Sequence, residues 1–193
     1  HYSRDNSRMK FRCLYSFKIP GGPGGEKYIL LESPDRETFR QMTKEEVGNP
    51  SLIPNGWKPF RKGPLNSQHF SPTRTVEFEF KGNKFHPGRN RQWTVDPQKD
   101  LPRLAEMGYL IEEGSTLAYK LYLKDNPLLE INNLWTDTAF GTMPRDQLYV
   151  VQTNTKVIER CILMTTDPGD LVLDPTCGSG TTAYVAAQWG RRW

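Results

Sequence analysis

One segment, Leu171–Thr182, constrains the fold of this 193-residue chain more than any other. Its first residues, Leu171–Leu173, form a short apolar run that predicts a buried strand, and an acid and two glycines follow. A helix rich in small residues is expected next, over Thr181–Trp189. A short β-branched strand at Tyr149–Val151 and a helix over Lys156–Met164 are expected before the run. This alternation of strands and helices predicts the beginning of a parallel α/β sheet.

The details of the glycine loop narrow the choice of ligand. A phosphate-binding P-loop is excluded, because no lysine follows Gly180. Gly178 and Gly180 supply two glycines of a dinucleotide fingerprint, and Ala183 can serve as the third. Asp174, directly after the strand, is unfavourable beside a pyrophosphate but suits S-adenosylmethionine, which carries a sulfonium and an ammonium and no phosphate. The pattern therefore favours that cofactor over NAD; a tight turn capped by Asp174 and binding no ligand is the alternative.

The chain from Gln152 through Val157–Ile162 to Asp167–Thr182 resembles the amino-methylating DNA methyltransferases. It is most similar to the group whose cofactor half lies at the C-terminal end, as in type III modification subunits. A Gln-Lys-Pro segment precedes the cofactor strand in that family; Gln152 matches it, whereas Thr153 and Asn154 replace Lys-Pro. The resemblance implies an α/β fold, with an incomplete Rossmann-like S-adenosylmethionine-binding lobe preceded by an irregular α+β target-recognition region. The cofactor-binding residues it implies are Asp174, Pro175, Thr176, Gly178, Gly180, Thr181, Gln152 and Thr153.

The resemblance implies transfer of a methyl group to an exocyclic amine of double-stranded DNA, with adenine N6 as the expected target. The family's catalytic tetrapeptide, [DNS]-P-P-[YFW], is not in this chain, which has no Pro-Pro pair. We therefore expect an internal fragment that is inactive by itself, and no catalytic residue is assigned. Cytosine N4 methylation and a non-catalytic DNA-binding fragment are the alternatives, and a restriction subunit is the further partner that the resemblance implies.

Basic residues are concentrated between Arg61 and Arg91, where seven Lys or Arg stand against two Glu. Aromatic residues are interleaved with them, a combination typical of nucleic-acid surfaces. A solvated face of a β-rich domain, with the aromatic side chains inside, is the alternative. The expected DNA-binding residues are Arg74, Lys81, Lys84, Arg89 and Arg91.

The rest of the chain divides at glycine-rich and turn-forming stretches. Residues 1–26 end in a glycine run and are expected to be a linker or the end of an upstream segment. We assign 27–140 to target recognition and 141–193 to the first part of the cofactor lobe. Within 27–140, a strand is expected at Tyr28–Leu31 and irregular structure at Glu32–Ser71.

Three regular elements are expected further along the target-recognition region. Strict alternation over Thr75–Phe80 predicts a hairpin whose two-residue loop is Gly82-Asn83. Asp96 and Pro97 predict the start of a helix that runs to about Met107. A second hairpin is expected from Tyr109–Ile111 and Leu117–Leu123.

Composition excludes two broad classes. No apolar run approaches the roughly 18–20 residues of a membrane span, and no secretory h-region follows the N-terminus, so a membrane protein and a secreted precursor are excluded. The three cysteines, Cys13, Cys161 and Cys177, form no C-x-x-C pair and argue against a disulfide framework or a zinc knuckle. A cytoplasmic protein without a bound metal is expected.

Overall fold

The computed structural model describes residues 5–138 and 153–193. The chain forms two compact units, one of Phe17–Pro127 and one of His1–Ser16 together with Leu128–Trp193. These boundaries differ from the expected divisions after residues 26 and 140, because the N-terminal residues group with the C-terminal ones. The strand expected at Tyr149–Val151 lies outside the described residues.

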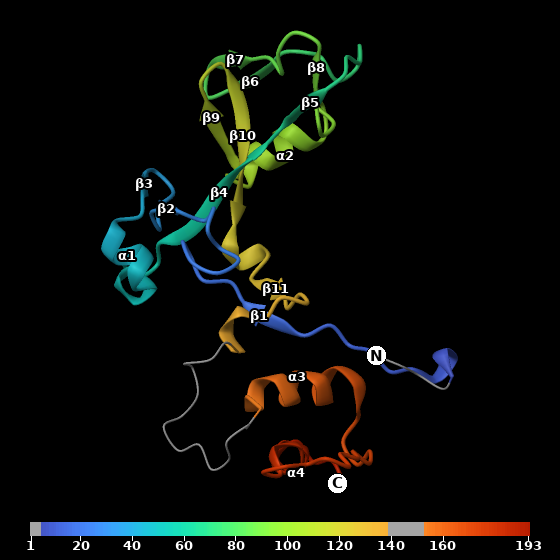
Figure 1. The fold of residues 1–193 in the computed structure, drawn as a ribbon. Coiled ribbons are helices and arrows are strands. Elements are labelled where there is room, and N and C mark those ends of the chain that lie inside the picture. Colours follow the sequence, from blue (N-terminus) through green and yellow to red (C-terminus); the bar gives the residue numbers. More distant parts are fainter. Residues whose placement is uncertain (1–4, 139–152) are drawn as a thin grey trace. The chain divides into compact units, whose positions relative to one another are not determined.

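The unit Phe17–Pro127 is built on a five-stranded antiparallel sheet of order β3-β2-β4-β10-β9 (Figure 1). Its strands are β2 (Leu30–Glu32), β3 (Phe39–Gln41), β4 (Lys58–Pro64), β9 (Leu110–Glu113) and β10 (Thr116–Tyr122). Two smaller sheets pair β5 (Asn66–Gln68) with β8 (Arg91–Trp93) and β6 (Phe78–Phe80) with β7 (Asn83–Phe85). The α-helices are α1 (Lys44–Gly48) and α2 (Asp100–Glu106), and short 3-10 helices cover Pro50–Leu52 and Leu123–Asp125.

Two clusters of buried side chains hold this unit together. The larger one joins the small sheets, α2 and the edge of the main sheet, and contains Leu65, Phe85, Trp93, Leu101, Leu110 and Leu117. Trp93 is fully buried, and its Nε1 donates to the carbonyl oxygen of Val76 at 2.9 Å. The second cluster surrounds Phe60 of β4. Burial of this apolar surface is the main stabilising term for the unit.

Irregular structure at Glu32–Ser71 was the wrong expectation, because β4, a long strand of the main sheet, lies there. The turn-forming residues Pro59 and Pro64 concealed it. Residues 58–60 of β4 pair with β2 and residues 60–64 pair with β10, so each proline has a neighbouring strand on one side only. A residue without an N–H group is tolerated where one side of a strand is unpaired.

The first hairpin is confirmed, with its loop one residue earlier than expected. Phe80 pairs with Asn83, so the loop is Lys81-Gly82, and both residues have positive φ, +53° and +80°. Positive φ at both positions is the geometry of a type I′ turn, which matches the twist of the strands. The expected register would have placed Lys81 opposite Lys84. The observed one places Glu79 opposite Lys84, which avoids a like-charge pair.

The remaining predictions for this unit are shifted by a few residues. The helix α2 begins at Asp100, later than expected, because Asp96 caps a preceding turn by accepting from the backbone N–H groups of Gln98 and Lys99. Its end near Met107 is confirmed, because α2 ends at Glu106 and Gly108 follows with φ +73°. The second hairpin is confirmed as β9 and β10. The first strand lies at Leu30–Glu32 instead of Tyr28–Leu31. The glycine run forms a hydrogen-bonded turn, with Gly21 N–H donating to the Gly25 carbonyl at 3.0 Å.

The helix α1 begins with a capping box that also binds an arginine. Thr43 and Glu46 satisfy each other's backbone N–H groups, and both carboxylate oxygens of Glu46 accept from Arg40, at 2.6 and 2.7 Å. The Arg40 guanidinium, followed by the Thr43 N–H, lowers the pKa of Glu46 from 4.5 to about 2. The ionised carboxylate is therefore part of the folded state.

We expect Glu46→Gln to flatten the acid limb of the stability curve. A carboxyl whose pKa is lowered on folding stabilises the fold above its unfolded pKa, and this contribution is lost as the pH falls through the folded value. The wild type should therefore lose more stability than Glu46→Gln between pH 4.5 and 2. Urea denaturation at a series of pH values measures this, with the exposed Glu37→Gln as the matched control. Parallel curves for wild type and Glu46→Gln would contradict the assignment.

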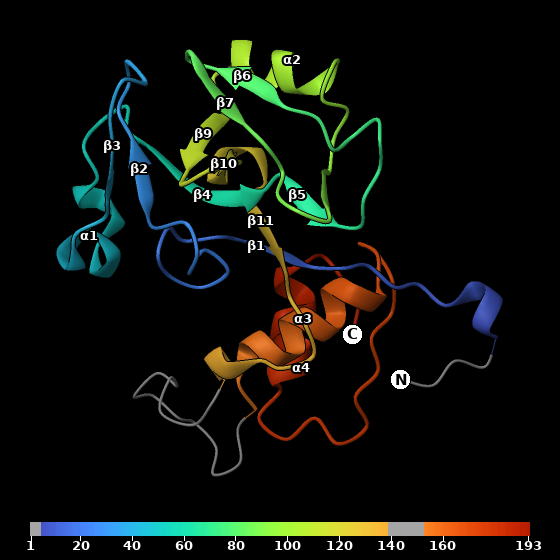
Figure 2. The same cartoon turned by 90° about the horizontal axis from the view of Figure 1, so that it is seen from above.

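The second unit contains a two-stranded sheet and two packed helices. Strand β1 (Tyr15–Phe17) pairs with β11 (Leu128–Glu130), and 3-10 helices cover Asn6–Arg8 and Thr136–Thr138. The helices α3 (Thr155–Thr165) and α4 (Thr181–Gln188) lie side by side (Figure 2), close to their expected ranges. Ile162, Val185 and Ala186 form their buried contact.

A buried strand at Leu171–Leu173 was the wrong expectation. Val172 packs against the two helices, whereas Leu171 and Leu173 are 67% and 84% exposed. Leu171 forms a single parallel bridge with Arg192. Alternation along an extended segment sends every second side chain to the opposite face. The described chain places helices over only one of these faces.

The N-terminal segment of this unit lies along the end of α3. The backbone N–H of Arg12 donates to the carbonyl of Met164 at 2.9 Å, and the Arg12 side chain binds the carbonyl of Thr166 and the carboxylate of Asp167. Lys10 contacts Asp167 and Asp170, each at 2.7 Å. Cations at a helix C-terminus also interact favourably with the helix dipole.

Candidate functional site

The loop between Leu173 and α4 is organised around one carboxylate. The hydroxyl of Thr182 donates to Asp174 Oδ2 at 2.6 Å, and the backbone N–H of Thr176 donates to Oδ1 at 3.1 Å. The Thr182 hydroxyl, and then the Thr176 N–H, lower the pKa of Asp174. The carboxylate is thus held ionised at the first turn of α4.

Two glycines bring the loop into the helix. Gly178 and Gly180 have φ values of +52° and +79°, a region that residues with a Cβ rarely adopt. A Cβ at Gly180 would meet no other atom within 4 Å, so the space beside this backbone is open. The loop therefore presents accessible backbone beside an ionised carboxylate and the N-terminal turn of a helix.

The packing of α3 against α4 positions this loop. A buried arginine, Arg191, joins the ends of both helices, donating to the Thr166 hydroxyl, the Thr166 carbonyl and the Trp189 carbonyl at 2.6–3.0 Å. The N–H of Val172 donates to the Arg192 carbonyl at 2.8 Å, which orients the segment leading to Asp174.

The structure brings some of the expected cofactor residues together. Asp174, Thr176, Gly178 and Gly180 lie in one loop, with Pro175 exposed between the first two. The side chain of Thr181 is buried and its hydroxyl contacts that of Ser179, so it supports the loop from within.

Two expected residues precede α3, and one contributor was missed. Thr153 is exposed and lies one residue before Asn154, whose side chain caps α3; Gln152 lies outside the described residues. Sequence reasoning missed Thr182, which makes the shortest contact to Asp174. Its spacing of eight residues from the acid, which places it at the second position of α4, is the signal that could have found it.

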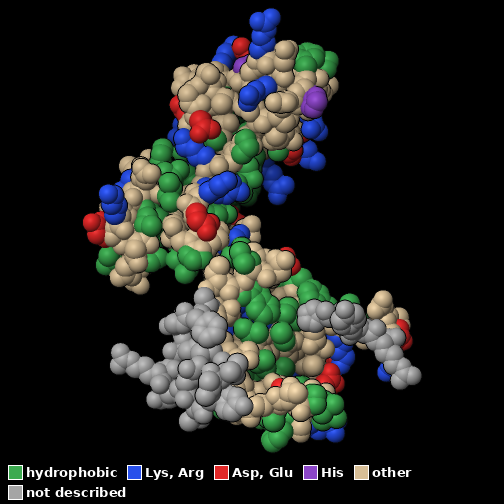
Figure 3. Space-filling model, in the orientation of Figure 1, with side chains coloured by type: hydrophobic (Ala, Val, Ile, Leu, Met, Phe, Trp, Pro, Cys, Tyr) green, Lys and Arg blue, Asp and Glu red, His purple; other side chains and the backbone are tan. Residues whose placement is uncertain are grey.

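The expected DNA-binding residues are all exposed in the unit Phe17–Pro127. Figure 3 shows Lys and Arg side chains, with histidine, over the end of this unit where Figure 1 labels β5 to β8. Lys84 lies 3.5 Å from Glu77, so part of its charge is compensated. Arg91 donates to the Asn66 side chain at 2.9 Å. The alternation of Phe78 and Phe80 places both rings against the buried cluster.

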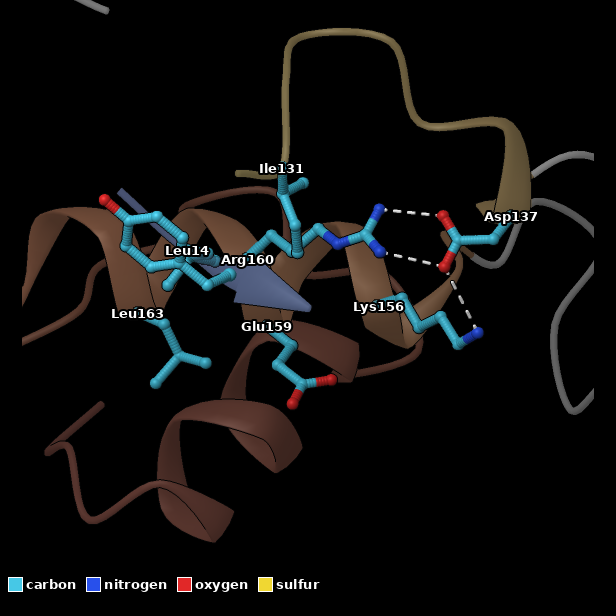
Figure 4. Close-up of a pocket in the computed structure, with 8 residues that line it drawn as sticks. Leu14, Ile131, Asp137, Lys156, Glu159, Arg160 and Leu163 are labelled. Carbon is cyan, nitrogen blue, oxygen red and sulfur yellow. Dashed lines mark hydrogen bonds and ion pairs between the residues drawn. The ribbon is translucent and has the colours of Figure 1, made fainter. Parts of the chain in front are cut away.

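The second unit also contains a pocket of about 330 Å³, lined by charged and apolar side chains (Figure 4). Asp137 accepts from both terminal nitrogens of Arg160, at 2.8 and 2.9 Å, and lies 3.4 Å from Lys156. Arg160 is stacked over the ring of Trp135, 5.2 Å from its centroid. Arg160 is the main cause of the lowered pKa of Asp137. A carboxylate paired in this way is a poor general base, so the pocket supports a structural role for Asp137.

The described residues offer neither a metal site nor a membrane-spanning helix. Residues 5–138 and 153–193 contain no group of three His, Cys, Asp or Glu side chains placed to hold a metal ion. Within the same ranges no helix has the length and apolar character needed to cross a membrane. The three cysteines are free thiols.

Comparison with known proteins identifies the family. The family model N6_N4_Mtase, described as DNA methylase, matches residues 26–193. The chain belongs to this DNA methylase family. The expectation of an amino-methyltransferase is therefore confirmed at the level of the family, whereas membership of the type III group is not.

Two individual relatives of this methylase chain are named as type II methyltransferases. The type II methyltransferase M.EcaI of Enterobacter cloacae is 26% identical over 200 residues, which cover 99% of this chain and 41% of that protein. The type II methyltransferase M.BamHI of Bacillus amyloliquefaciens is 53% identical over 38 residues, 20% of this chain and 9% of that protein.

A further relative is the probable type III restriction-modification enzyme HindVI Mod subunit of Haemophilus influenzae. It is 39% identical over 70 residues, 34% of this chain and 9% of that protein. The chain thus spans less than half the length of each of these relatives. No solved structure matches the chain.

Proposed function

We propose that this chain is part of a site-specific DNA methyltransferase that moves a methyl group from S-adenosylmethionine to the N6 amine of adenine. The observation that carries the proposal is the loop from Asp174 to Thr182, in which an ionised carboxylate and open backbone meet at the start of α4. Membership of a DNA methylase family supports the same chemistry and implies the same cofactor.

The residues of the loop fit S-adenosylmethionine. This cofactor carries positive charge, on its sulfonium and its ammonium. Asp174 supplies an ionised carboxylate to face that charge, and the hydrogen bonds that it accepts lower its pKa. The positive φ of Gly178 and Gly180 lets backbone approach a ligand without an intervening Cβ. In the proposed site Asp174, Pro175, Thr176, Gly178 and Gly180 contact the cofactor, and Thr181 supports them. Thr153 and Gln152, before α3, complete it.

S-adenosylmethionine supplies an electrophilic methyl group on its sulfonium. The contribution proposed for this chain is to hold the cofactor in one orientation, since positioning is a large part of the catalysis of a bimolecular transfer. We further propose that residues 141–193 belong to a Rossmann-like lobe. The parallel bridge between Leu171 and Arg192, with α4 between them, supports this topology.

The unit Phe17–Pro127 is proposed to contact DNA. Arg74, Lys81, Lys84, Arg89 and Arg91 are exposed there, and Lys or Arg near a phosphate backbone supplies most of the non-specific affinity of such proteins. A restriction subunit is proposed as a protein partner, because one relative is named as a type III Mod subunit.

We expect Asp174→Asn to weaken binding of S-adenosylhomocysteine or S-adenosylmethionine by about 10- to 100-fold, because a charge-assisted contact contributes roughly 1–3 kcal/mol. Isothermal calorimetry on the protein measures the dissociation constant. Thr182→Val is the matched control. It removes the hydrogen bond to Asp174 but keeps the charge, so its affinity should stay closer to that of the wild type.

Each result of this calorimetry separates the alternatives. Equal losses in the two variants would mean that Asp174 acts by holding the turn. Unchanged affinity in both would mean that the loop is not the cofactor site.

The target base is decided by mass spectrometry of nucleosides from DNA that has been exposed to the methyltransferase of which this chain is proposed to be a part. We expect N6-methyladenine. N4-methylcytosine would instead assign the proposed activity to the N4 amine of cytosine.

A further inference from the structure

An open groove of about 520 Å³ lies at the end of the β5–β8 pair. It is lined by Gln68, His69, Phe70, Arg89, Asn90 and Arg91, which belong to two segments brought together by strand pairing. Gln68 lies directly opposite Arg91 in the antiparallel register. All the lining residues are exposed.

Hydrogen bonds and a buried neighbour hold the residues that line the groove in place. Asn66 accepts a hydrogen bond from Arg91, which orients that guanidinium across the two strands. The hydroxyl of Thr75 donates to the Arg91 carbonyl at 2.8 Å and accepts from the Ser71 N–H at 3.2 Å, so the turn after Phe70 is tied to β8. Trp93, two residues beyond Arg91, is fully buried. Ordered walls reduce the entropy that a ligand would otherwise have to overcome.

Backbone conformation at the rim is unusual. His69 and Asn90 have φ values of +94° and +57°. Asparagine tolerates the left-handed region near +57°, whereas histidine at +94° lies outside that region. Such outliers are concentrated at sites with a binding or catalytic role.

The charge and chemistry of the groove suit duplex DNA. Neither residues 64–76 nor residues 80–95 contain an Asp or a Glu, so the lining is cationic without an acid in either segment. Gln68, Arg89 and Asn90 carry the amide and guanidinium groups that form paired hydrogen bonds with base edges. Phe70 is 63% exposed and offers an apolar surface to a thymine methyl group or a base step.

We propose that this groove reads base edges and determines the target sequence, whereas Lys81 and Lys84 on the β6–β7 hairpin contact phosphates. The inference rests on the proposed function, since it assigns sequence discrimination to one part of the DNA-binding unit. It predicts that specificity and salt dependence can be separated by substitution, because base contacts specify and phosphate contacts position.

The test uses a library of duplexes with a randomised core, selected for binding to the protein and then sequenced. The groove variant is Gln68→Ala with Phe70→Ala. The matched control, the hairpin variant, is Lys81→Asn with Lys84→Gln, in which asparagine tolerates the positive φ at position 81. All four positions are exposed, and equal urea midpoints verify that both variants fold.

We expect the wild type to enrich a sequence motif, and the groove variant to lose the preference at one or more positions of it. For the groove variant, the ratio of non-specific to specific dissociation constants should fall by about tenfold or more. Its salt slope should not change. The hairpin variant should keep the motif and flatten the slope of log K against log salt by about one to two units.

An unchanged motif and ratio in the groove variant would overturn the inference while leaving DNA binding intact. If the wild type bound DNA without enriching a motif, or did not bind it, site-specific recognition by this unit would fail and the inference with it.

Discussion

Replacing Glu32 with alanine is expected to lower the free energy of unfolding of the unit Phe17–Pro127 by roughly 3–5 kcal/mol. Glu32, on β2, is 1% exposed and accepts hydrogen bonds from Lys120 Nζ and from the Tyr122 hydroxyl, the latter at 2.6 Å. Burial, followed by the contact with Glu32, raises the pKa of Tyr122, so its phenol remains a donor at neutral pH. Lys120 is itself only 8% exposed. Removing the carboxylate of Glu32 therefore leaves a buried ammonium group without its partner.

The loss comes from the uncompensated charge, and a second variant tests this. Glu32→Leu combined with Lys120→Met and Tyr122→Phe replaces the three polar groups with apolar ones of similar size, which is often neutral for a buried ion pair. It should recover most of the stability that Glu32→Ala loses. Urea denaturation followed by tryptophan fluorescence and far-UV circular dichroism measures both. A loss below about 1 kcal/mol in Glu32→Ala, the range of surface ion pairs, would contradict a buried pair.

Neutralising Lys81, Lys84, Arg89 and Arg91 together is expected to flatten the salt dependence of DNA binding by up to about 3–4 units of log K per log salt. Each cation that neutralises a phosphate contributes about 0.9 to that slope, and we expect the guanidinium groups of Arg89 and Arg91 to lie close enough to the duplex backbone to do so even while the groove reads base edges. The charge of Lys84 is already partly compensated by its ion pair with Glu77. The expected flattening of the slope is therefore closer to about 3 than to 4 units. Affinity for a duplex at several salt concentrations, measured by fluorescence anisotropy, gives the slope.

A control variant separates the effect of lowering the net charge from the effect of removing cations at these four positions. A control with Lys27, Lys44, Lys99 and Arg103 changed to glutamine removes the same charge from exposed positions of the same unit. It should leave the slope closer to that of the wild type. Cofactor affinity should be unaffected in both variants, since the loop from Asp174 to Thr182 belongs to the other unit. An unchanged slope in the first variant would mean that its cations form a solvated face and that DNA is held elsewhere.

The parts of the candidate site that were predictable are those with local signals. The glycines at 178 and 180, the helix after them and the acid before them follow one another within a few residues, and the structure assembles them into one loop. The prediction that the strand before the loop is buried was wrong. An apolar run of three residues does not reveal how many of its faces are covered, and Leu171 and Leu173 remain exposed.

The register of the first hairpin shows how cross-strand pairing decides between close alternatives. Glycine at 82 is compatible with a loop at 81–82 or at 82–83. Cross-strand pairing of Glu79 with Lys84 selects the first, and both aromatic residues of β6 then pack on the core. The prolines of β4 had the opposite effect, because they concealed a strand whose one-sided pairing accommodates them.

The sequence by itself determined the elements that depend on local periodicity and turn chemistry: α3, α4, the hairpins, the glycine loop and the family they indicate. Only the tertiary structure decided which distant residues meet. Glu32 binds Lys120 across 88 positions, Asp137 binds Arg160 across 23, and the groove joins residues 68–70 to 89–91. Such contacts leave no periodic trace in the chain, because they depend on strand pairing and on the burial of both partners, which exist only once the sheet has formed.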